Sequence, residues 1–298
     1  MKHFKFLLFL SFLSSIVSSC AFNTIFLHPT QISSEANLQT MYIQDDTVNV
    51  YYLGDNKQPL FVRNGEDTVE FRHSIESVLF LSESGNLLNG WMLKPKNIEP
   101  KATLLFFHGN SGDLASTHWS MTLLLQEGFQ VFAVDYSGYG LSEGKAKRKH
   151  LLKDGNSAVN YLLSREDVKD TKVIIYGQSL GGHLAAVVTT ENQEKIDGLV
   201  IEGAFSSHKD IGKEFAGFVG KWFVKEMYSA KTSLPNFTKP LLVIHSTEDE
   251  IIPFFMGQKL YDVAHEPKEF YEIDGCHICG SRLYAKEIAD KIFKLVKD

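Results

Sequence analysis

The sequence predicts an α/β fold with a doubly wound, mostly parallel sheet, and two observations carry this prediction. Short apolar runs alternate with helical stretches from Pro100 to the carboxyl terminus. Most of these runs are continuously apolar, which is typical of parallel strands that are covered on both faces. The chain has 298 residues, of which 44% are apolar and 22% charged, so one domain can bury a large core.

The elements are expected in a regular order. Residues 20–76 read as a polar, irregular lead-in, and the globular domain is expected over 77–298. Strand-like runs on both sides of Ser84-Gly85-Asn86 predict a hairpin first. The core strands are then expected at Thr103–Phe107, Gln130–Val134, Lys172–Tyr176, Gly198–Ile201, Leu241–His245 and Lys268–Ile273. The helices are expected at Ser116–Gln126, His150–Ser164, Leu180–Thr190, Phe255–Val263 and Arg282–Val296.

One connection, about 203–238, is longer than the others and rich in aromatic residues. Its apolar spacing indicates one or two amphipathic helices. Two interpretations remain: a small helical cap over a functional site, or a peripheral helix whose aromatic side chains only pack. The residues concerned are Phe205, Phe215, Phe218, Val219, Trp222 and Phe223.

The amino terminus has the pattern of a secretory signal peptide over 1–19. Lys2 and Lys5 precede the apolar run Phe6–Val17, which is shorter than the roughly 20 residues that a membrane-spanning helix needs. Val17-Ser18-Ser19-Cys20 also resembles a bacterial lipobox. This resemblance implies cleavage before Cys20, acylation of that cysteine and a lipid-anchored protein of the cell envelope, with the outer membrane favoured. The alternative is a simple cleaved signal and a soluble periplasmic or secreted protein.

The charge distribution argues against a nucleic-acid partner. The formal net charge is −6, and the charges are spread along the chain. The densest basic stretch, 145–150, is short and is typical of a solvated start of a helix. No polyanionic partner is therefore expected.

Gly177-Gln178-Ser179-Leu180-Gly181 fits G-x-S-x-G between a predicted strand and a predicted helix. In this context the serine occupies a strained turn that exposes its hydroxyl as a nucleophile, and the flanking glycines avoid a steric clash. The helix that begins there favours the negative charge that develops during acyl transfer. Ser179 is therefore the candidate nucleophile.

An acid and a base follow in the chain order that this motif requires. Three carboxylates, Glu248, Asp249 and Glu250, come after the strand Leu241–His245, and a carboxylate there can hold the tautomer of an imidazole. His277 follows the last strand and precedes the last helix, which places it at the carboxyl edge of the sheet.

The loop after the first core strand supplies the remaining part of a hydrolytic site. His108-Gly109-Asn110-Ser111-Gly112 lies where an amide donor for an oxyanion is needed. The backbone N–H groups of Asn110 and Leu180 are the expected pair of donors. Each such donor is worth roughly 3–4 kcal/mol in a preorganised site.

Together these segments resemble the α/β-hydrolase superfamily, and within it the Bem46-like branch, from about Ser77 to the carboxyl terminus. The supporting stretches are His108-Gly109-Asn110, residues 135–144 and residues 177–182. Residues 245–253 are similar to the H-G-x-x-D-x-x-I-P segment of the superfamily, which selects Asp249 as the acid and leaves its two neighbours as solvated loop charges. The resemblance implies the α/β-hydrolase fold and ester, thioester or amide hydrolysis without a metal or organic cofactor.

Cysteines on both sides of His277 depart from the family pattern. Apart from Cys20, the only cysteines are Cys276 and Cys279, an even pair that fits a disulfide in an oxidising compartment. Such a bridge would make the histidine loop rigid. Metal binding is disfavoured because C-H-x-C lacks a second ligand pair. A redox role for the two thiols is the other alternative.

The sequence thus predicts a serine hydrolase that uses Ser179, Asp249 and His277 on a small-molecule ester or thioester. The aromatic residues of 203–238 favour an apolar pocket for an acyl chain. A serine peptidase of the same fold is the nearest alternative. A non-catalytic, lipid-anchored binding protein on the same scaffold is the alternative from another class, because a fold does not dictate a function.

Overall fold

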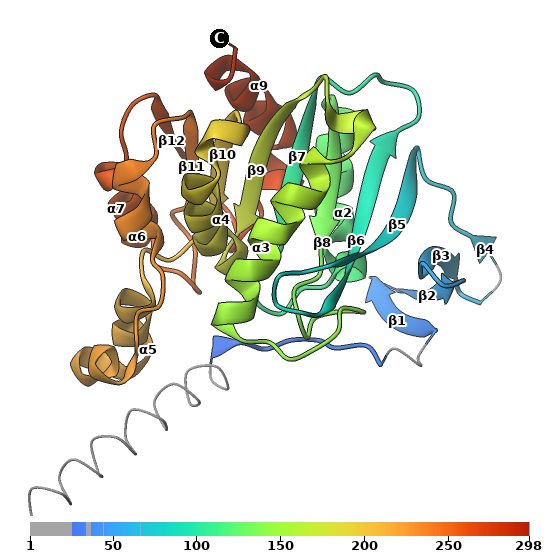
Figure 1. Cartoon of the computed structure of the whole chain (residues 1–298), viewed down its shortest axis with the longest axis horizontal. Coiled ribbons are helices and arrows are strands. Elements are labelled where there is room, and N and C mark those ends of the chain that lie inside the picture. The colour runs from blue at the N-terminus through green and yellow to red at the C-terminus, as the bar shows by residue number, and fades with distance from the viewer. Residues whose placement is uncertain (1–25, 34–36, 44, 66, 298) are drawn as a thin grey trace, which may run out of the picture.

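The computed structural model describes residues 26–33, 37–43, 45–65 and 67–297, and their strands form two sheets. The larger sheet has eight strands in the order β12-β11-β10-β9-β7-β8-β6-β5 (Figure 1). Its strands are β5 (His73–Leu81), β6 (Leu87–Pro95), β7 (Ala102–Phe107), β8 (Phe129–Val134), β9 (Lys172–Gln178), β10 (Gly198–Glu202), β11 (Leu241–Ser246) and β12 (Lys268–Ile273). The strands from β7 to β12 are parallel, and β6 pairs antiparallel with both β5 and β8. The predicted doubly wound α/β-hydrolase fold is confirmed.

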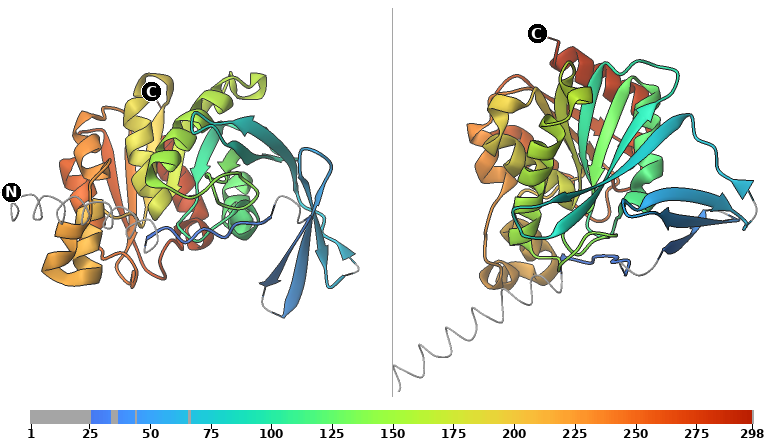
Figure 2. Two further views of the ribbon diagram at one scale, coloured as in Figure 1. Left: turned by 60° about the horizontal axis from the view of Figure 1, so that its bottom comes forward. Right: turned by 45° about the vertical axis from the view of Figure 1, so that its right-hand side comes forward.

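Helices cover both faces of this sheet, as Figures 1 and 2 show. Buried side chains of α3, α4, α6 and α7 pack in the core on one face, and those of α2 and α9 pack on the other. The helices are α2 (Leu114–Gln126), α3 (Arg148–Leu163), α4 (Leu180–Glu191), α5 (His208–Phe223), α6 (Ala230–Ser233), α7 (Phe255–Val263), α8 (Gly280–Leu283) and α9 (Ala285–Leu295). Every residue of β7, β8, β10 and β11 is buried, which explains why these strands are mostly apolar.

The second sheet corrects one expectation. The lead-in, expected to be irregular, contains four strands that form an antiparallel sheet, which projects from one side of the molecule in Figure 2. Val48, Val50, Tyr52 and Phe61 are buried on one face and pack with the α2 side of the main core. Its strands are β1 (Leu38–Ile43), β2 (Asp46–Leu53), β3 (Gln58–Arg63) and β4 (Asp67–Thr68).

The carboxyl-terminal helix is also corrected. One helix was expected over 282–296, but the structure has α8 and α9, separated at Tyr284, whose φ of −132° and ψ of 29° are not helical. Within the expected cap segment, α5 is kinked at Ala216 and Gly217 and protrudes at the carboxyl edge of the sheet in Figure 1. The side chains of residues 218–223 and the whole of residues 1–25 lie outside the described part of the chain.

Candidate active site

Ser179 occupies a tight turn between β9 and α4. Its backbone has φ 54° and ψ −117°, a left-handed conformation that is strained for a residue with a Cβ. The turn requires glycine on both sides. A Cβ at Gly177 would lie 2.3 Å from the carbonyl oxygen of Gly181, and one at Gly181 would lie 2.1 Å from that of Phe107. The turn is therefore pressed against the end of β7, with Ser179 at the carboxyl edge of the sheet.

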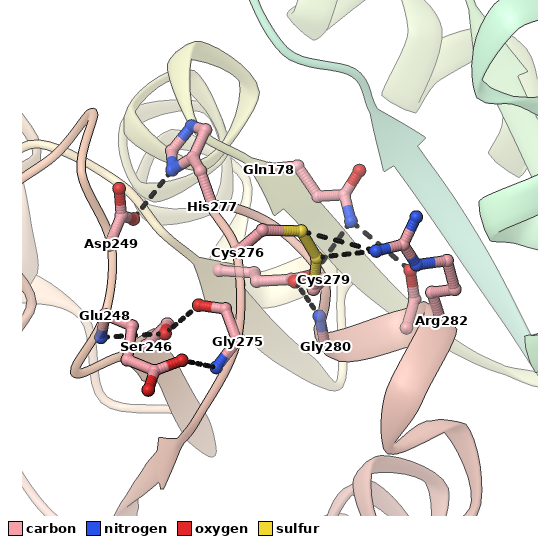
Figure 3. Close-up of a disulfide and its surroundings, with 12 residues drawn as sticks. Gln178, Ser246, Glu248, Asp249, Gly275, Cys276, His277, Cys279, Gly280 and Arg282 are labelled. Carbon is pink, nitrogen blue, oxygen red and sulfur yellow. Dashed lines mark hydrogen bonds and ion pairs between the residues drawn. A yellow bond between two sulfur atoms is a disulfide. The ribbon is translucent and has the colours of Figure 1, made fainter.

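His277 and Asp249 meet at the same edge. Nδ1 of His277 lies 2.6 Å from Oδ2 of Asp249, an interaction drawn in Figure 3, and the Asp249 side chain is fully buried. The N–H groups of Ile251 and Ile252 donate to Oδ1 of the same carboxylate at 2.9 and 2.8 Å. Burial alone would raise the pKa of Asp249, but hydrogen bonds from His245, His277 and the backbone hold it well below its usual range. The carboxylate therefore stays charged and can fix the imidazole tautomer.

The end of β10 contacts both the serine turn and the imidazole. The N–H of Ser179 donates to the carbonyl of Glu202 at 2.8 Å. The next residue is Gly203, and a Cβ there would lie 3.2 Å from both Cε1 and Nδ1 of His277. On the other side, a Cβ at Gly109 would lie 3.6 Å from Cβ of Ser179 and 3.8 Å from Cδ1 of Ile278. Gly109 and the end of β10 thus lie between the serine turn and the histidine loop and contact both.

Asn110 and Leu180 share a cavity with Ser179, whereas His277 lines another cleft. Both line a cavity of about 110 Å³ together with Ser179. In the part of the chain that the structure describes, no acceptor binds the backbone N–H of either residue. The Asn110 side chain is already engaged, because its Oδ1 accepts the N–H of His28 at 3.0 Å and the hydroxyl of Tyr139 at 3.1 Å. Two backbone donors therefore remain for a ligand oxygen.

The cavity is mostly apolar. Apart from Ser179 and the two residues with these N–H groups, its lining comes from the start of the described chain, from the segment before α5, from α5 and from the acid loop. These residues are Phe26, Leu27, Phe205, His208, Ile211, Phe215, Ile251 and Ile252. An apolar pocket with a few convergent polar groups is the usual form of a small-molecule site.

The loop that carries His277 is fastened at several points. A disulfide joins Cys276 and Cys279 on the two sides of His277 (Figure 3). Glu248, expected to be a solvated charge, is exposed but accepts the N–H of Gly275 at 2.9 Å. The histidine loop is therefore tied both to itself and to the loop of its acid partner.

Glu202 is a residue that sequence reasoning missed. Its carboxylate is buried and accepts three hydrogen bonds: from the Tyr176 hydroxyl at 2.7 Å, from Nε2 of Gln178 at 2.8 Å and from the N–H of Gly280 at 2.6 Å. One side chain thus links the residue before Ser179 to the residue after the disulfide. No sequence signal marks it, because its donors come from segments 24 to 78 residues away.

Replacing Glu202 by Gln is expected to lower kcat for a reaction at Ser179 by about 10–100-fold and to change KM little. An amide cannot accept from donors on both sides, so the histidine loop shifts, and displacements of about 1 Å cost up to about 100-fold in rate. This prediction is checked by steady-state kinetics and thermal unfolding of the variant and of the exposed control Glu194→Gln. A defect confined to KM, or explained by a smaller folded fraction, contradicts the positioning role.

Two other histidines have structural surroundings. His183 is buried, and its Nδ1 contacts the carbonyl oxygen of Phe205 at 3.0 Å. His245 is buried near the end of β11, where its Nε2 lies 2.9 Å from the carbonyl oxygen of Ile252 and 3.4 Å from Oδ2 of Asp249. Among the described residues, no group of three or more metal-ligating side chains could hold an ion, and no helix there is long and apolar enough to span a bilayer. Cys20 lies outside the described residues.

Comparisons with known proteins agree on the fold. Residues 98–232 match the family described as "Serine aminopeptidase, S33". Uncharacterized protein YfhR of Escherichia coli O157:H7 is 36% identical over 213 residues, covering 69% of this chain and 74% of that protein. Protein bem46 of Schizosaccharomyces pombe is 32% identical over 208 residues, covering 67% and 70%. A solved esterase of Pyrococcus furiosus superposes with a TM-score of 0.62 at 19% identity, covering 76% and 91%.

Proposed function

The chain belongs to the Bem46-like branch of the α/β-hydrolase superfamily and is a hydrolase, and from that premise we propose that it cleaves carboxylic ester or thioester bonds through an acyl-enzyme intermediate on Ser179. The observation that carries the proposal is the contact between His277 and Asp249 beside a strained serine. A binding protein would have no need to maintain that contact and two open backbone donors around one hydroxyl.

In the proposed mechanism, Nε2 of His277 takes the hydroxyl proton of Ser179 as Oγ attacks the carbonyl carbon. The N–H groups of Asn110 and Leu180 bind the resulting oxyanion. The bond to the leaving group then breaks, and His277 returns the proton to the departing alcohol or thiol. Water, deprotonated by His277, attacks the acyl group, and the carboxylic acid leaves as Ser179 recovers its proton. Asp249 stabilises the imidazolium during both the formation and the hydrolysis of the acyl-enzyme.

A fluorophosphonate probe tests the proposal directly. We expect one covalent adduct per chain, located on Ser179 by peptide mass spectrometry, and competition by a p-nitrophenyl ester. A panel of esters, thioesters and peptides under the same conditions separates an esterase from a peptidase. Absence of the adduct from folded protein would reject the function.

We also propose that the chain is exported and anchored to the bacterial envelope, with the outer membrane favoured, through acylated Cys20. The support is the signal-like run Phe6–Val17 followed by the lipobox-like residues before that cysteine. Several acyl chains would hold the protein firmly, whereas one chain binds only marginally. Mass spectrometry of the mature protein is expected to find an acylated terminus at Cys20. An unmodified terminus at another position would disprove the anchor.

A further inference from the structure

The first described residues lie against the site, although they belong to the expected lead-in and precede the family match. We call residues 26–32 the strap. In Figures 1 and 2 the strap runs along the carboxyl edge of the main sheet, between α5 and the four-stranded sheet. Phe26 and Leu27 line the same cavity as Ser179. Leu27 is only 4% exposed, so it is part of the core there.

Hydrogen bonds fasten the strap to the loops that form the site. The N–H of His28 donates to Oδ1 of Asn110, which belongs to the candidate oxyanion loop. Further along, the N–H of Ile32 donates to the carbonyl of Gly140 at 2.7 Å, and the N–H of Gly140 donates to the carbonyl of Thr30 at 2.8 Å. Through these two reciprocal hydrogen bonds the strap pairs with the loop of residues 135–144.

The strap also meets α5. The rings of Phe26 and Phe215 contact edge to face, with their centroids 5.8 Å apart. Ile211, one turn earlier on α5, lines the cavity as well. The walls on the two sides of the cavity therefore join through an aromatic pair.

We infer that the strap and α5 form an acyl pocket that selects esters of short, unbranched carboxylic acids, and that Phe26 and the half-exposed Phe215 set its length. The inference rests on the serine-hydrolase function proposed above. The acyl group is assigned here because the cavity holds the candidate nucleophile and both oxyanion donors, and the rest of its lining is mainly apolar. The open cleft beside Cys276 and His277, which Glu248 also lines, is then left for the leaving group.

The volume of the cavity decides the chain length. A dry apolar cavity of about 150 Å³ accommodates benzene. At about 110 Å³, this pocket holds an acyl group of roughly four to six carbons. Longer chains must push the aromatic pair apart or leave their ends in water, and either loses the gain from burying further methylenes.

The experiment measures kcat/KM for p-nitrophenyl acetate, butanoate, hexanoate, octanoate and decanoate with the full chain. The wild-type protein is expected to be fastest on butanoate or hexanoate. In Phe26→Ala and in Phe215→Ala, the ratio of decanoate to butanoate activity should rise by about tenfold or more, since each methylene that finds a place in the pocket is worth about fourfold. Phe255→Ala is the matched control, because Phe255 is a partly exposed phenylalanine outside the cavity lining.

The possible outcomes distinguish a failure of the inferred pocket from a failure of the proposed function. A shift towards long chains in Phe215→Ala supports the pocket even if Phe26→Ala loosens the strap and loses activity on all esters. Wild-type chain profiles in Phe215→Ala, with Phe26→Ala either unshifted or uniformly weaker, overturn it. A shift of the same size in Phe255→Ala also overturns it. If wild-type protein neither hydrolyses any ester nor reacts with the fluorophosphonate probe, the function itself fails.

Discussion

Replacing Ser179 by Ala is expected to lower kcat for p-nitrophenyl butanoate by about a millionfold, to the residual rate that binding and oxyanion donors alone provide. The proposed reaction has no acyl-enzyme without the Ser179 hydroxyl. The same variant should no longer react with the fluorophosphonate probe. Initial rates and in-gel labelling measure both effects.

This substitution should leave the fold intact. Among the described residues the Ser179 hydroxyl makes no hydrogen bond, so alanine removes none. Thermal unfolding should therefore give nearly the same midpoint for Ser179→Ala and for wild type. Turnover that survives in folded Ser179→Ala, after removal of contaminating esterases, would identify a different nucleophile.

Asp249→Asn is expected to lower kcat by about 10⁴-fold with little change in KM. In the wild-type protein the carboxylate accepts the hydrogen bond from Nδ1 of His277 at 2.6 Å. In the variant, an amide that points its NH₂ group there stabilises the other imidazole tautomer. The pKa of Asp249 is held below its ordinary value, so the wild-type carboxylate keeps its charge at neutral and mildly acidic pH. Mild acid therefore does not neutralise this carboxylate, and the defect of the variant persists throughout that range.

The neighbouring acids provide the control for this choice of residue. Glu250 is exposed, and we expect Glu250→Gln to stay within about twofold of wild-type kcat, since surface charges contribute little. Steady-state kinetics on the two variants in parallel decide the assignment. A larger loss in Glu250→Gln than in Asp249→Asn would assign the role of the acid to Glu250 and contradict the geometry around His277.

The main sheet and the positions of the candidate triad could be predicted because local sequence determines them. The strands β7 to β12 are short apolar runs, and their carboxyl ends must meet at one edge when they are parallel. The glycines on the two sides of Ser179 are recognisable in the sequence because any other residue there would place its Cβ against backbone atoms. The contact of His277 with Asp249 follows from these ends, whereas their catalytic roles are proposals that await the experiments above.

The remainder depends on contacts between distant segments. The β1–β4 sheet was mistaken for irregular chain, although the alternation Val48, Val50, Tyr52 gave a strand signal within polar surroundings. The strap has no periodicity, because it is held by Asn110 and Gly140 and not by neighbours in sequence. Glu202 gives no sequence signal for the same reason: a buried carboxylate is recognised only when its three donors are known.

The position of Phe26 limits how far the pocket can stand from a lipid anchor. Only five residues lie between Cys20 and Phe26, and the six steps from one to the other span about 20 Å at full extension. With Cys20 acylated as proposed, the mouth of the pocket would be tethered within that reach of the bilayer surface. The enzyme would then sample acyl esters at the lipid–water boundary, and its effective substrate concentration would be set by partitioning into the membrane and not by bulk solubility.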